Sequence, residues 1–180
     1  MFGTSLTITT HSINTASECY VMHAAREYCA GRGITVPSAV ARNGNGKPFF
    51  FRRDDIHLSL SHSAGYIAVV ISDSPVGVDI QQHKPCRVKA ISERFFHPDE
   101  IFYLQNHPSR FFDVWTAKES YSKYTGEGII ASFGGFSVTT QNRFRKKIGN
   151  CFLSLFPIFH CFSVAVTNER SGDISVFIDI

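Results

Sequence analysis

Strand-like segments that are separated only by short turns restrict the fold more than any other feature of the sequence. His57–Ser61 and Tyr66–Ser72 are joined by a turn at Ala64-Gly65, and Val76–Gln81 follows the second of them. The remaining pattern predicts helices at Glu18–Ala30, Val88–Phe95, Pro98–Gln105 and Ser109–Thr125, and strands at Phe136–Thr140, Cys151–Leu155, Cys161–Thr167 and Ile174–Ile180. Because the helices and strands are segregated rather than alternating, the sequence predicts an α+β fold with antiparallel sheet and argues against a doubly wound sheet.

Composition is consistent with a small enzyme. A chain of 180 residues with 43% hydrophobic content can bury a substantial core. It has no apolar run long enough to cross a membrane and no signal-peptide pattern at its start, so we expect a cytoplasmic protein with no membrane association. Its five cysteines are odd in number and form no CxxC pair, which favours reduced thiols over a disulfide framework or a zinc site.

The strand-like segment Val76–Gln81 carries a carboxylate on one of its faces. The alternation of a strand sends the β-branched residues to one face, and Gly77, Asp79 and Gln81 to the other. Asp79 therefore stands near the end of a buried strand with an amide beside it. Taken alone, such an aspartate is more often a cap or turn residue.

A second candidate lies in the predicted helix. Trp115, Glu119 and Lys123 are four residues apart, so a carboxylate and an ammonium project from one face. A solvated pair of small stabilising value is the structural interpretation of that spacing. In the functional interpretation Glu119 and Asp79 bind one metal ion, because a hard divalent cation takes carboxylate oxygens together with substrate phosphates. Lys123 would then neutralise phosphate oxygens as a point charge.

Two further motifs precede these, Gly46-Lys47-Pro48 and Ser61-His62-Ser63. The four motifs, in this order, resemble those of the 4′-phosphopantetheinyl transferases of the surfactin-synthetase-activating type, whose chains carry GKP, SHS, GxDI and then WxxKES. The resemblance covers roughly Arg26 to Val138 and includes Phe95–Glu100, before the predicted helix that carries Glu119.

The resemblance implies a magnesium-dependent enzyme, with manganese as the alternative ion. It would transfer the 4′-phosphopantetheine group of coenzyme A to a serine of an acyl or peptidyl carrier protein and release adenosine 3′,5′-bisphosphate. Asp79, Glu119 and Lys123 would be the catalytic residues, with Glu119 accepting the serine proton directly or through a water molecule. Asp79 and Glu119 would hold the metal, together with Gln81.

Binding of coenzyme A is implied for Lys47, Ser61, His62 and Lys123, and family members add basic side chains from a longer amino-terminal segment. That segment is missing or reduced here, and the nearest substitutes are Arg26, which we include among the binding residues, and Arg32. A second departure concerns the metal, because the family often reads GxDIE where this chain has Gln81. An amide can ligate through its oxygen but contributes no charge.

The chain shows signs of an internal repeat. Gly31 and Gly126 end the two longer helical stretches and lie 95 residues apart, and the Leu-Ser-Leu triplets that start at Leu58 and Leu153 have the same separation. Chance remains an alternative for such short matches. The resemblance likewise implies two similar halves of helix plus antiparallel sheet related by pseudo-twofold symmetry. We therefore expect a single catalytic domain, 1–180, built of two pseudo-repeats at approximately 1–73 and 74–180.

Charge discriminates poorly between partners. The net charge is +3, and the one dense basic run is Arg143–Lys147, which suits either a solvated hairpin or a docking surface for an acidic protein. We expect coenzyme A and a carrier protein as partners, no nucleic acid, and a monomer, since both halves of the cleft lie in one chain. A catalytically impaired homologue that binds coenzyme A or a carrier protein is the alternative function, and a nucleic-acid-binding module is the weaker one.

Overall fold

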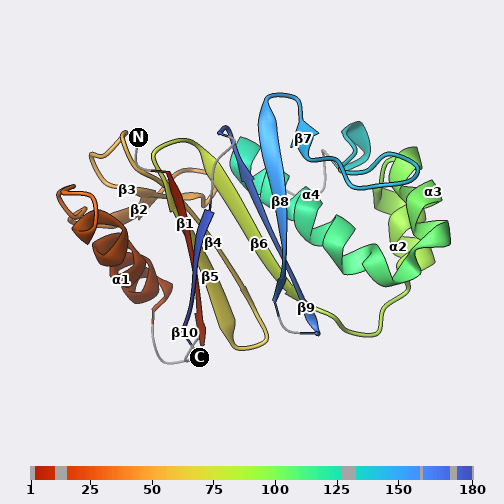
Figure 1. Cartoon of the computed structure of the whole chain (residues 1–180), viewed down its shortest axis with the longest axis horizontal. Coiled ribbons are helices and arrows are strands. Elements are labelled where there is room, and N and C mark those ends of the chain that lie inside the picture. The colour runs from red at the N-terminus through yellow and green to blue at the C-terminus, as the bar shows by residue number, and fades with distance from the viewer. Residues whose placement is uncertain (1–2, 11–15, 127–132, 159, 171–173, 180) are drawn as a thin grey trace.

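Two four-stranded sheets form the centre of the structure, a computed structural model that describes residues 3–10, 16–126, 133–158, 160–170 and 174–179 (Figure 1). The strand order is β10-β1-β5-β4 in the first sheet and β6-β9-β8-β7 in the second, and β2 and β3 form a separate pair. The strands are β1 (Thr4–Thr10), β2 (Val40–Arg42), β3 (Pro48–Phe50), β4 (His57–Ser63), β5 (Tyr66–Ser72), β6 (Val76–Gln82), β7 (Lys147–Ile148), β8 (Cys151–Ile158), β9 (Phe162–Asn168) and β10 (Ile174–Asp179).

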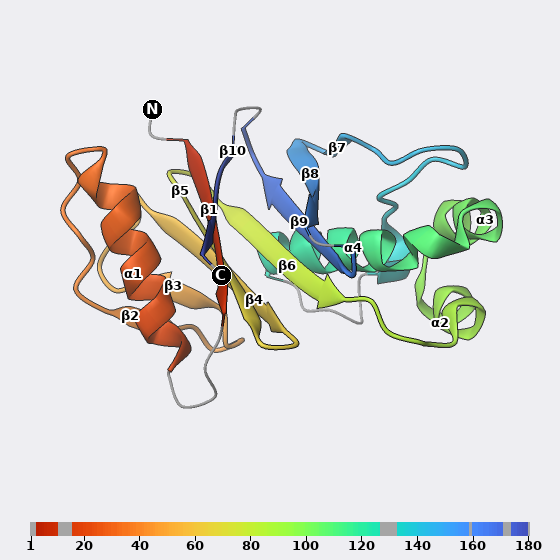
Figure 2. The same cartoon turned by 60° about the horizontal axis from the view of Figure 1, so that its bottom comes forward.

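The helices lie outside the two sheets. They are α1 (Ser17–Ala30), α2 (Val88–Phe95), α3 (Pro98–Asn106) and α4 (Phe111–Thr125), with single 3-10 turns at Pro108–Arg110 and Phe133–Gly135. Helix α1 covers one side of the molecule and α4 lies on the other side (Figure 2). No helix within the described ranges is both long enough and apolar enough to span a membrane. The predicted α+β class is confirmed.

One strand pair departs from the predicted antiparallel arrangement. Strand β1, which the sequence analysis did not predict, pairs antiparallel with β5 but parallel with β10. Strand β10 follows β9 in the chain and yet belongs to the sheet of the first half. The chain end therefore crosses back to the first sheet, which a short-range pattern cannot indicate.

The predicted strand at Phe136–Thr140 is wrong. In that segment only Thr139 forms a bridge, with Phe144. The backbone oxygen of Phe136 accepts from Lys118, and the backbone N–H of Val138 donates to Glu100. Buried charged side chains thus satisfy the groups that a strand partner would otherwise have to satisfy.

Glu100 and Lys118 form an ion pair whose side chains are completely buried, with Nζ 2.8 Å from the nearer carboxylate oxygen. The same oxygen of Glu100 also accepts from the backbone N–H of His97, and the Lys118 ammonium lies 4.1 Å from the ring centroid of Phe136. Burial raises the pKa of Glu100 and lowers that of Lys118, while their mutual attraction opposes both changes. The pair ties α3, α4 and the segment after residue 132 into one unit.

The order of elements is similar in residues 1–73 and 74–180. The first segment runs β1, α1, β2, β3, β4, β5 with β5 between β1 and β4, and the second runs β6, α2, α3, α4, β7, β8, β9 with β9 between β6 and β8. Helices α2 and α3 are an addition in the second half. The helix ends differ locally, because Gly126 is left-handed with a φ of 77° whereas Gly31 has a φ of −74°.

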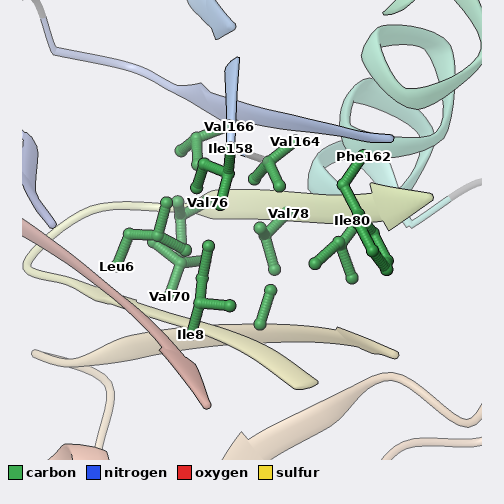
Figure 3. Packing of buried hydrophobic residues seen from close by; sticks show 11 residues of the cluster. Leu6, Ile8, Val70, Val76, Val78, Ile80, Ile158, Phe162, Val164 and Val166 are labelled. Atoms are coloured by element: carbon green, nitrogen blue, oxygen red, sulfur yellow. The ribbon is translucent and has the colours of Figure 1, made fainter. Parts of the chain in front are cut away.

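The main core lies between the two sheets, where branched side chains from both sheets pack together (Figure 3). Leu6, Ile8 and Val70 come from the first sheet, and Val76, Val78, Ile80, Val164 and Val166 from the second. Two smaller cores lie under α1 and under α4. The layers are therefore helix, sheet, sheet and helix, each sheet being apolar on both faces.

Three serines of β4 join the facing edges of the two sheets. Strands β4 and β6 belong to different sheets, and the hydroxyls of Ser59 and Ser63 accept the backbone N–H groups of Val78 and Gln82 at 3.1 and 3.0 Å. Between these two bonds, the hydroxyl of Ser61 donates to the carboxylate of Asp79. Serine side chains here replace a backbone ladder. The backbone N–H groups at this edge of β6 therefore have hydrogen-bond acceptors although β4 and β6 stay in separate sheets.

Gly77 allows α4 to lie directly on β6. A Cβ atom at Gly77 would overlap the backbone oxygen of Ser120 and would lie 2.6 Å from the backbone nitrogen of Tyr124. Both obstacles belong to the α4 backbone and cannot rotate away. The absence of a side chain at Gly77 therefore sets the distance between the strand of Asp79 and the helix of Glu119.

The Gly77→Ala substitution should be strongly destabilising, because either the helix or the strand must move. We expect a loss of about 1–3 kcal/mol or more in the free energy of unfolding, measured by urea denaturation. Gly135→Ala is the matched control, since an added Cβ there meets no atom within 4 Å. Equal stability of the two variants would contradict this account of the α4–β6 contact.

Candidate active site

Asp79 is the centre of the candidate site. Its side chain is 5% exposed, and one carboxylate oxygen, Oδ1, accepts both from the hydroxyl of Ser61 and from the ammonium of Lys123 at 2.7 Å. The other oxygen, Oδ2, is buried and has no hydrogen-bond partner among the described residues. Burial raises the pKa of Asp79, and Lys123 opposes that rise. A buried carboxylate oxygen without a partner is the group that a bound cation would satisfy.

Glu119 lies close to Asp79 on the neighbouring helix. Its side chain is buried, and within the part of the chain that the structure describes its carboxylate accepts no hydrogen bond. Burial, together with the negative charge of Asp79, raises the pKa of Glu119 from the usual 4.5 to about 7, and Lys123 acts in the opposite direction. The two carboxylates therefore interact electrostatically.

Lys123 lies between the carboxylates and the surface. Its side chain is 25% exposed, and its ion pair with Asp79 joins the end of α4 to β6. It also lines a cavity of about 500 Å³ that is bounded by β4, α4 and the segment from Arg42 to Pro48. The candidate site is thus a buried acidic pair with a cation at the mouth of an open cavity.

The structure brings Lys47 to the same cavity, from the other half of the chain. Its ammonium donates to the backbone oxygen of Tyr124 at 2.9 Å, and its partial burial lowers its pKa. The GKP motif therefore lies against the last turn of α4, next to Lys123. Sequence order alone could not place the two motifs together, since Lys47 and Tyr124 are 77 positions apart in the chain.

Gln81 follows Asp79 on the same face of β6, as predicted. Its amide nitrogen donates to the hydroxyl of Ser63 at 3.4 Å and to the backbone oxygen of Gln82 at 3.2 Å. These bonds use the donors of the amide and leave its oxygen as an acceptor. Within the described ranges, no three His, Cys, Asp or Glu side chains lie together.

The other predicted binding residues are spread over the first half. Ser61 is buried and points to Asp79, whereas His62 is exposed, because neighbouring residues of β4 face opposite ways. Arg26 is exposed on α1 and is absent from the described lining of the cavity. Arg32 donates to the backbone oxygen of Tyr28 and lies over its ring, so its contacts stabilise the end of α1.

Several residues that support the site were not predicted. Ser59 and Ser63 hold β6, Gly77 sets the position of α4, and Glu100 fixes the helix through Lys118. Arg42 is a further cation in the cavity lining. The sequence did contain a signal for the serines, since Ser59, Ser61 and Ser63 alternate with apolar residues along one strand.

The titration of Glu119 provides a test of the acidic pair. In metal-free protein we expect a carboxyl group that titrates near pH 7, visible by carbon-13 NMR. Asp79→Asn should lower that pKa, because the nearby negative charge that favours the protonated form is removed. Asp113→Asn removes a carboxylate of the same helix that does not contribute to the pKa of Glu119, and it should leave that pKa unaltered. An unchanged titration in Asp79→Asn would show that the two carboxylates do not interact.

Comparisons of the sequence with those of known proteins all point to one family. A sequence model of the 4′-phosphopantetheinyl transferase superfamily matches residues 75–173, which include β6, α4 and β9. The 4′-phosphopantetheinyl transferase psf-1 of Bacillus pumilus is 39% identical over 138 residues, which are 71% of this chain and 59% of that protein. The transferase gsp of Aneurinibacillus migulanus is 40% identical over 100 residues, 53% of this chain and 41% of that protein, and Sfp of Bacillus subtilis is 32% identical over 132 residues, 67% and 58%.

The matched segments thus span less than two thirds of these relatives. Within the chain, however, the family match covers more than half of the residues and contains both Asp79 and Glu119. The chain therefore belongs to the 4′-phosphopantetheinyl transferase superfamily.

Proposed function

We propose that this chain transfers the 4′-phosphopantetheine group of coenzyme A to a serine hydroxyl of an acyl or peptidyl carrier protein. The observation that carries the proposal is the interaction of the buried carboxylates Asp79 and Glu119 with Lys123, which itself lines a cavity together with two further cations. A cavity of about 500 Å³ is large enough for a nucleotide-sized ligand. The relatives are named as 4′-phosphopantetheinyl transferases, which supports the same reaction.

The reaction is a phosphoryl-type substitution. The serine oxygen attacks the β-phosphorus of coenzyme A, the bond to the departing adenosine 3′,5′-bisphosphate breaks, and the serine proton passes to Glu119. Without an ion, burial and Asp79 raise the pKa of Glu119 to about 7, and a bound divalent cation would lower it, which keeps Glu119 ionised and able to accept a proton. Lys123 neutralises negative charge that gathers on the phosphate oxygens.

A divalent cation fits the donor set of the site. Asp79 and Glu119 would hold it, with the side-chain oxygen of Gln81 as a further donor, and magnesium is the expected ion with manganese as the alternative. The unpartnered Oδ2 atom of Asp79 supports this fit. When bound, such an ion neutralises charge on the diphosphate and orients it.

The site suits a chain that acts as a single domain, 1–180, of two pseudo-repeats at approximately 1–73 and 74–180, related by a pseudo-twofold axis. The similar order of their elements supports that relation. Lys47 and Ser59 line the cavity from the first half and Ser122 and Lys123 from the second, so the cavity belongs to both. The mildly basic pI of about 8.6 is compatible with an acidic carrier protein as partner.

Transfer can be measured by mass spectrometry of an apo carrier protein incubated with the full chain, coenzyme A and magnesium. Asp79→Asn and Glu119→Gln should each reduce the rate by at least about a hundredfold, because each removes a charge at the reacting phosphates. Glu93→Gln, at an exposed position of α2, is the control.

Wild-type rates in both site variants would exclude this site as the catalytic centre. Tight binding of coenzyme A without magnesium dependence and without product would instead identify a binding protein that lacks catalysis.

Gln81→Glu should strengthen divalent cation binding, because it adds a third carboxylate next to Asp79. We expect about tenfold higher affinity by calorimetric titration with manganese, without coenzyme A. Gln82→Glu is a matched control, since the next residue of the strand faces the opposite way. Equal effects of the two variants would show that Gln81 does not face the ion.

A further inference from the structure

Positive charge is concentrated in the cavity between the two halves. Its described lining contains three cations, Arg42, Lys47 and Lys123, and no carboxylate. Figure 2 shows that their elements come from opposite sides, since β2 and β3 lie towards α1 while α4 lies across β6. A ligand that matches this lining carries anionic groups at more than one place along its length.

Two of these cations are already used by the protein. Lys123 is paired with Asp79 at 2.7 Å, and Lys47 donates to the backbone oxygen of Tyr124 at 2.9 Å. The first bond joins α4 to β6, and the second joins the segment of Lys47 to the last turn of α4. Both ammonium groups are therefore held by partners within the protein.

Arg42 is different. Its side chain is 46% exposed, one guanidinium nitrogen donates to the backbone oxygen of Gly46 at 3.1 Å, and another lies 3.3 Å from a carboxylate oxygen of Glu18. The Glu18 side chain is itself 48% exposed, so water screens this pair and the bond is weak. A guanidinium has five N–H donors in a planar fork, which leaves donors available for a phosphate.

We infer that Arg42 binds the 3′-phosphate of coenzyme A by exchanging the Glu18 carboxylate for the phosphate. This inference rests on the proposed function, which assigns the diphosphate to the site of Asp79, Glu119 and Lys123. The 3′-phosphate is then the remaining anion of the ligand, and Arg42 is the remaining cation of the cavity. Arg42 thereby takes the role that the sequence analysis gave to Arg26, which is exposed on α1 outside the described lining.

Dephospho-coenzyme A, which lacks only the 3′-phosphate, provides a direct test. Calorimetric titration of the full chain with each ligand gives two affinities per variant, without any need for turnover. Arg42→Gln should weaken the binding of coenzyme A by at least about tenfold and leave dephospho-coenzyme A unchanged. Arg52→Gln, an exposed arginine outside the cavity lining, is the control and should change neither affinity.

Glu18→Gln separates binding from a structural role. If the Arg42–Glu18 pair only held β2 against α1, both variants would lose affinity for both ligands alike. If Arg42 binds the phosphate, Glu18→Gln should bind coenzyme A at least as tightly as the wild type, because a competing carboxylate has been removed.

Three results would overturn the inference while the proposed function stands. They are equal losses for the two ligands in Arg42→Gln, no loss in that variant, or a loss specific to coenzyme A in Arg26→Gln in its place. Failure of the wild-type chain to bind either ligand, with magnesium present, would instead count against the proposed function itself.

Discussion

The buried carboxylate of Asp79 is the interaction on which the arrangement of this molecule depends. Asp79 belongs to β6, and its Oδ1 atom accepts from the hydroxyl of Ser61 in the first sheet and from the ammonium of Lys123 in α4. Three elements that are distant in the sequence thus meet at one oxygen atom. Taking a charge out of water is costly unless partners compensate it, so the burial of Asp79 constrains all three elements at once.

The partners of Asp79 can meet only because the backbones around them come close together. Gly77 removes the side chain that would separate β6 from α4, and the hydroxyls of Ser59 and Ser63 hold β6 beside β4 without a backbone ladder. Glu100, buried against Lys118, holds the same helix from its other side. The site therefore relies on tight packing and on the hydrogen bonds of the surrounding residues as well as on the reactive residues.

Local patterns were reliable where the chain has a strong period. The alternation in β4 to β6 and the spacing of Glu119 and Lys123 on α4 were both confirmed, and they placed the acidic residues on the correct faces. The strand expected at Phe136–Thr140 failed, because its backbone groups bond to Glu100 and Lys118 instead. Strand β1 was missed, since its short polar and apolar alternation gains its stability from β5 and β10.

The sequence by itself determined the residue types of the site, the faces on which they lie and the order of the four motifs, because these follow from the periods of strand and helix. Only the tertiary structure decided which distant groups meet. It brought Lys47 to the end of α4, turned Ser61 towards Asp79, and selected Arg42 over Arg26 for the cavity. Contacts between remote segments depend on how sheets and helices pack, and no local period encodes that packing.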